Sequence, residues 1–142
     1  MAIRKRIAAD VRVVSLHDDA VDWSRTPKLQ YAETRDPELI ALRGDEQPTW
    51  WTLRPLPPGV IGTVEGMSSM NRRRAAFAFG VVDCSDADEL GLVWDRHRVS
   101  PMITDQSMAN VPSKVVQEIG DLVLQRESMS EGESQRFAPS HF

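Results

Sequence analysis

The chain has 142 residues, a formal net charge of −4 and one cysteine. This length is typical of a single domain with one modest core, and one cysteine excludes an intrachain disulfide framework. The acidic balance gives no overall attraction to nucleic acid, and no apolar run approaches the roughly 20 residues of a membrane span. Because Asp10 and Arg12 interrupt the apolar start, we expect no signal peptide. We therefore predict a single domain over residues 1–142, made in a cytoplasm.

Residues 1–10 form a short basic arm that contains Arg4, Lys5 and Arg6. A charged terminus of this kind is commonly solvated, but it can also tether a chain to an acidic partner or to nucleic acid. We select these three residues as candidate partner-binding residues and favour a protein partner over nucleic acid. After the arm, the apolar run Val11 to Leu16 predicts a strand.

A β-hairpin is predicted further along the N-terminal half. Thr49 to Leu56 is rich in residues that favour strands, and Glu38 to Arg43 is a second short apolar run, separated from it by a connector that contains glycine. Alternation along the second run places Trp51 and Leu53 on one side. Trp50 lies on the opposite side, where we expect it to be half-exposed and available to a partner.

Two helices are predicted after this hairpin. Pro58 suits the first turn of a short helix, because the apolar residues that follow it recur at helical spacing. A second helix is expected to start with Ser69 or Asn71 as its cap, to run through Phe79 and to stop at Gly80.

Arg72, Arg73 and Arg74 lie near the start of this second helix, where the helix dipole disfavours cations. Three consecutive residues spread around most of a helix, so they do not form a single phosphate-binding face. They are either a solvated face or residues that bind the carboxylates of a partner or a nucleic-acid backbone. We select Arg72 and Arg73 as candidate partner-binding residues.

The C-terminal half contains the clearest helical pattern. Pro112 to Glu127 has a proline in its first turn and apolar residues at helical spacing, with Gly120 as its weakest position. Before it, the pattern predicts an acidic loop at residues 83–89, a strand from Leu90 to Val99, and then a further loop.

The tail, residues 128–142, is rich in serine and glutamate, and this composition predicts disorder. Phe137 and Phe142 are unusual in such a segment. Ordering either end of the chain costs conformational entropy that the end cannot recover by burying its own apolar surface. We therefore expect the basic arm and the two phenylalanines to dock onto neighbouring molecules.

No catalytic or metal-binding signature is present in the sequence. His17, His97 and His141 lie in three separate polar segments, without the spacing of metal ligands. Cys84 would need a positioned base to act as a nucleophile, and no local signature supplies one. We predict a protein that is not an enzyme and that uses no cofactor, metal ion or small-molecule substrate.

Four segments, in this order, resemble small proteins from the structural gene module of tailed bacteriophages. They are WTLRPL at 51–56, AAFAFGVVD at 75–83, VPSKVVQEI at 111–119 and the acidic SEGE at 130–133. The similar proteins have an LRPL strand, a helix end that leads into an apolar run, a helix that begins with a proline motif, and a short acidic tail. The resemblance spans about residues 38–134.

This resemblance implies a bacteriophage structural protein, bound in the assembled particle at the capsid or the head–tail junction. Its expected partners are other virion proteins and copies of itself, and its expected location is the virion, after synthesis in the host cytoplasm. The alternative is a tail assembly chaperone that acts transiently in morphogenesis, and a small enzyme is the least favoured class. The resemblance assigns no catalytic residues.

Together these elements predict an α+β fold, with a small antiparallel sheet that includes a hairpin, two or three helices, and extended N- and C-terminal arms. The apolar stripe of the C-terminal helix should cover the inner face of the hairpin, because an amphipathic helix must bury that stripe against another element. One apolar cluster should therefore contain Trp51, Leu53, Val115, Ile119 and Leu122.

Overall fold

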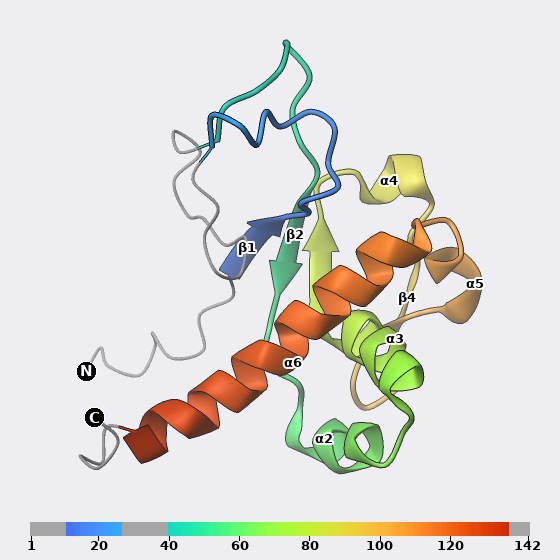
Figure 1. The fold of residues 1–142 in the computed structure, drawn as a ribbon. Coiled ribbons are helices and arrows are strands. Elements are labelled where there is room, and N and C mark those ends of the chain that lie inside the picture. The colour runs from blue at the N-terminus through green and yellow to red at the C-terminus, as the bar shows by residue number, and fades with distance from the viewer. Residues whose placement is uncertain (1–10, 27–39, 137–142) are drawn as a thin grey trace, which may run out of the picture.

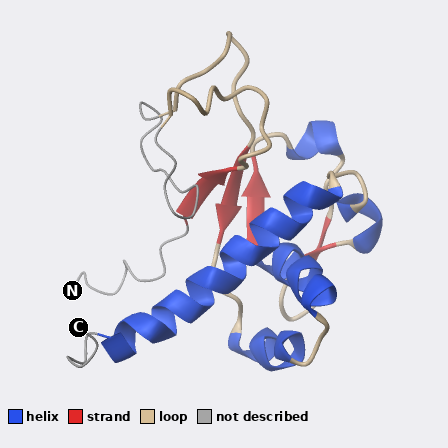
Figure 2. Cartoon of the chain, in the orientation of Figure 1, coloured by secondary structure: helices blue, strands red, loops and turns tan. Residues whose placement is uncertain are grey.

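The computed structural model describes residues 11–26 and 40–136, with residues 126–136 described by their backbone alone. The described residues have the predicted α+β fold, in which the long helix α6 crosses a small antiparallel sheet (Figures 1 and 2). The elements are, in chain order, β1 (Val11–Val14), β2 (Trp50–Leu53), α2 (Pro58–Glu65), α3 (Ser69–Gly80), β3 (Val81–Cys84), α4 (Ala87–Leu90), β4 (Trp94–Asp95), β5 (Met102–Ile103), α5 (Asp105–Met108) and α6 (Ser113–Arg136).

The central strand of the main sheet is β2, which pairs antiparallel with β1 on one side and with β3 on the other. The predicted hairpin between Glu38–Arg43 and Thr49–Leu56 is therefore wrong, because both edges of β2 are already occupied. Within the described part of the first run, Leu42 instead forms an isolated antiparallel bridge with Val21. The true partners of β2 are remote in sequence, so no local turn signal marks them.

The pleat of β2 divides its two tryptophans between two apolar clusters. Trp51 and Leu53 belong to the main core, together with Val11 and Val13 of β1. The predicted cluster is confirmed, because Val115, Ile119 and Leu122 of α6 lie in the same core. The opposite face of the sheet carries the smaller cluster, which consists of Val14, Val21 and Trp50.

The helices α3 and α6 cross in the main core. They can approach each other closely because each has a glycine at the crossing. A Cβ atom on Gly120 of α6 would lie 2.1 Å from the carbonyl oxygen of Arg73 in α3. A Cβ atom on Gly80, the last residue of α3, would lie 2.6 Å from two methyl carbons of Val123. Real Cβ atoms do not approach other heavy atoms so closely, so each helix contributes a glycine at the point where the other approaches it.

The two predicted helices of the middle region are confirmed, with one change of cap. Pro58 is the first residue of α2, whose buried residues are Val60 and Val64. The N-cap of α3 is Ser68, whose side chain accepts a hydrogen bond from the backbone amide of Asn71. The chain passes from Gly80 directly into β3, so the residues after the helix form a strand.

Three expectations for the second half of the chain are corrected. The acidic loop at 83–89 contains the end of β3 and the single-turn helix α4, and the predicted strand at 90–99 is reduced to Trp94–Asp95. The loop at 100–110 contains β5, which pairs with β4, and the single-turn helix α5. Such short elements carry too few residues for a periodic signal.

The tail expected to be disordered is helical over residues 128–136, because α6 continues to Arg136. Propagation of an existing helix adds one hydrogen bond per residue and avoids the cost of nucleation. The segment also contains two glutamates and one each of methionine, glutamine and arginine, which have good helix propensity. Residues 137–142 lie outside the described residues.

Candidate partner-binding surface

Five of the eight predicted partner-binding residues lie outside the described residues. These are Arg4, Lys5 and Arg6 in the basic arm, and Phe137 and Phe142 in the tail.

Trp50 is described, and its predicted half-exposure is wrong because only 9% of its surface is exposed. The guanidinium carbon of Arg12 lies 4.4 Å from the centroid of its ring, and Val14 and Val21 pack in the same cluster. Trp50 therefore holds the irregular segment around Val21 against the outer face of the sheet.

The three arginines of α3 have separate surroundings. Arg72 is half-buried, and its Nη2 atom donates a hydrogen bond to the carbonyl oxygen of Met67 at 3.3 Å. The guanidinium groups of Arg73 and Arg74 lie 3.8 Å from carboxylate oxygens of Asp121 and Asp105 respectively. Ion pairs at this distance between exposed side chains contribute little to stability, so the structure leaves these cations available for other anions.

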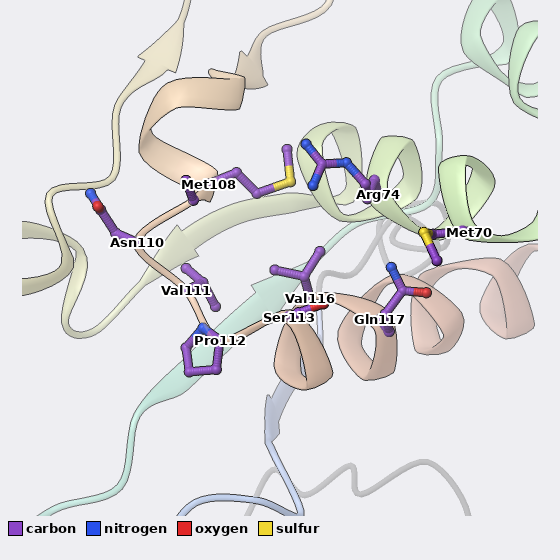
Figure 3. Close-up of a pocket in the computed structure, with 10 residues that line it drawn as sticks. Met70, Arg74, Met108, Asn110, Val111, Pro112, Ser113, Val116 and Gln117 are labelled. Atoms are coloured by element: carbon purple, nitrogen blue, oxygen red, sulfur yellow. The ribbon is translucent and has the colours of Figure 1, made fainter.

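A groove of about 450 Å³ lies between α3, the end of α5 and the first turns of α6. Its floor is apolar and consists of Met108, Val111 and Val116, all of which are buried. Met70 and Arg74 line the groove from α3 (Figure 3). Met70 is 62% exposed, so its side chain is accessible at the edge of the groove.

The rim of the groove is polar, and Arg74 is the only charged side chain among the described residues that line it. Asn110, Ser113 and Gln117 complete this rim and offer neutral hydrogen-bonding groups. Methionine side chains adapt readily to the shape of an apolar partner. An exposed methionine, Met70, and a cation, Arg74, beside this neutral polar rim suit a helical segment that carries acidic residues.

The groove could not be predicted from the sequence, because its walls come from residues 70–74 and residues 108–117, which are remote from each other in the chain. From the three consecutive arginines we selected Arg72 and Arg73 as partner-binding residues, whereas Arg74 is the arginine that lines the groove. The exposed side chain of Met70 would have indicated the groove, but helical spacing in the sequence does not show which apolar residues are exposed.

A second hollow, of about 210 Å³, contains His17 and Asp18 near the end of β1. The carboxylate of Asp18 accepts hydrogen bonds from the backbone amides of Ala20 and Thr49, at 2.9 and 2.8 Å. Among the side chains that the structure describes, no group of three or more His, Cys, Asp or Glu is placed to hold a metal ion. The role of Asp18 that the geometry supports is to fix the turn after β1.

Cys84 lies at the end of β3 and is buried in the main core. Desolvation by burial raises the pKa of its thiol from 9.0 to about 12, and the nearby charges of Asp86 and Asp83 act in the same direction. The thiolate is the reactive form of cysteine, so this thiol is poorly reactive in the folded protein.

We expect Cys84 to react with an aromatic disulfide reagent at pH 8 only when the protein unfolds. The measurement is the rate of thiol release, with the same protein in concentrated urea as the control for full accessibility. A native rate equal to the rate in urea would contradict the burial of Cys84.

None of the helices in the described part of the chain is long and apolar enough to cross a membrane. Comparison of the whole chain with protein-family models, curated proteins and solved structures gives no match.

Proposed function

We propose that this chain is a bacteriophage structural protein that is bound in the assembled particle, at the capsid or the head–tail junction. It acts through protein–protein contacts, and its partners are other virion proteins and copies of itself. The resemblance of residues 38–134 to proteins of the phage structural module supports the phage setting. The form of α6 supports a role in assembly.

The proposal rests mainly on one observation: α6 is longer than the part of it that packs against the main core. The helix runs for 24 residues, from Ser113 to Arg136. Among the side chains that the structure describes, which end at Gln125, the last one of α6 in the main core is Val123, with Leu124 packed against that core. Residues 126–136 would add about 16 Å of helix at 1.5 Å per residue. Figure 1 shows this part of α6 extending past the sheet and α3.

A helix that extends beyond its own domain needs another surface, because tertiary packing supplies most of the stability of helices in proteins. The groove beside Met70 and Arg74 is a second surface suited to contact with another chain. A small domain with a projecting helix and an open groove is well suited to a place in a repeating assembly.

The test is density-gradient centrifugation of a lysate from the producing host, with an antibody against the chain. We expect the chain to sediment with complete particles and to remain with them after a high-salt wash. Detection only in the soluble fractions at the top of the gradient would contradict the proposal and favour a transient tail assembly chaperone.

A further inference from the structure

We infer that the groove lined by Met70, Arg74 and Met108 binds the C-terminal part of α6 from a second copy of this chain. This inference deepens the proposed function and rests on it for its biological setting. In this contact between copies, the groove of one chain binds the C-terminal part of α6 of the next chain. The contact is therefore head-to-tail.

The groove has the features of a site for an acidic helix. Three apolar residues of its lining, Met108, Val111 and Val116, are almost fully buried, and Met70 is exposed at its edge. Arg74 gives the groove a positive charge, and no acidic side chain is among the described residues that line it. Asp105, the intramolecular partner of Arg74, is 3.8 Å away and itself highly exposed, so a better-placed carboxylate can replace it.

The C-terminal part of α6 has the complementary charge. Residues 126–136 contain the acidic residues Glu127, Glu131 and Glu133 and the basic residues Arg126 and Arg136, so their formal charge is −1. The same segment contains one large apolar residue, Met129. Its backbone is helical throughout, so it is already in the conformation that a groove would bind. Opposite charges on groove and segment favour this pairing and select against others.

The two surfaces lie at opposite ends of one helix, so they cannot meet within one molecule. The groove includes Ser113, Val116 and Gln117 from the first turns of α6. Glu127 and Glu133 lie ten to twenty residues further along the same helix, which is about 15 to 30 Å at 1.5 Å per residue. The occupant must come from another copy. A contact between two different surfaces of one chain repeats from copy to copy and generates a ring or a filament.

The test is sedimentation velocity of the full chain at increasing protein concentration, in low salt. We expect the wild-type chain to associate beyond a dimer, since a head-to-tail contact leaves a free groove and a free helix at the two ends. Arg74→Glu should weaken association by about tenfold or more, because it places like charges together. The triple change Glu127→Lys, Glu131→Lys and Glu133→Lys should weaken it similarly.

Charge exchange provides the decisive comparison. An equal mixture of the Arg74→Glu chain and the triple-lysine chain should associate again, because each groove then meets a segment of opposite charge. A chain that carries all four changes should associate alone. The matched control is Arg43→Glu, which reverses an exposed arginine outside the groove and should leave association unchanged. Circular dichroism of each variant verifies that it is folded.

A wild-type chain that stays monomeric up to its solubility limit would overturn this inference, as would folded Arg74→Glu that associates like the wild type. These results are distinguishable from failure of the proposed function, which is measured by co-sedimentation with particles. A monomeric chain that co-sediments with particles would overturn the self-contact and leave the particle role in place.

Discussion

Replacement of Gly120 by alanine is expected to destabilise the domain severely, by roughly 3 kcal/mol or more. The new Cβ atom would lie 2.1 Å from the carbonyl oxygen of Arg73 and 2.8 Å from its carbonyl carbon. These are backbone atoms of α3, so they cannot move aside as the end of a flexible side chain can. Alanine gains about 1 kcal/mol over glycine in helix propensity, which is too little to offset separation of the two helices. The measurement is urea unfolding, followed by circular dichroism.

The matched control is the same substitution at Gly62, which lies within α2 and where an added Cβ atom would meet no heavy atom within 4 Å. Here the helix-propensity gain is unopposed, so Gly62→Ala should stabilise the domain by about 0.5 to 1 kcal/mol. Opposite signs at the two glycines are the expected result. Equal stabilisation at both positions would show that α3 and α6 do not cross at Gly120.

Truncation of Ile119 to alanine has the second large expected effect, a loss of roughly 2 to 5 kcal/mol. Ile119 is fully buried in the main core, in the cluster that also contains Trp51 and Leu53. Removal of its side chain deletes apolar contacts and leaves a cavity between α6 and the core. The free energy of unfolding in urea measures the loss.

Val99→Ala is the control for Ile119→Ala, because Val99 is fully exposed. Its effect should lie within about 0.5 kcal/mol of zero. If Ile119→Ala also lost less than about 0.5 kcal/mol, α6 would not be a core helix of this domain.

Local periodicity explains what the sequence predicted correctly. Alternation along β2 separated Trp50 from Trp51, and the structure places them in two clusters on opposite faces. The apolar stripe of α6 identified Ile119 as a core residue for the same reason. These signals depend on neighbours within one element, which a single sequence contains.

Strand pairing was predicted wrongly because it depends on segments far apart in the chain. Val13 and Cys84 both pair with Trp51, although each lies more than thirty residues from it. The glycine-containing connector before β2 is a valid turn signal, but it does not determine which strands meet. In the structure, the run before that connector contributes only the bridge of Leu42 to Val21 within its described part.

The role of the two glycines at the crossing of α3 and α6 also depends on contacts between distant segments, so the sequence alone does not predict it. From sequence, Gly120 is a weak point in a helix, since glycine has poor helix propensity. The structure shows that Arg73 approaches it so closely that a larger residue would not fit. The groove could not be predicted for a related reason. Arg74 lines it and Arg72 and Arg73 do not, and this difference depends on how α3 packs in the fold.

The most direct test of the particle role is the copy number of this chain in purified virions. Quantitative mass spectrometry with isotope-labelled peptides from residues 40–125 would measure it against a major shell protein. The proposed function predicts a fixed ratio that is the same in independent preparations and that survives a high-salt wash. Absence from the particles, or a trace amount that decreases with each purification step, would contradict it.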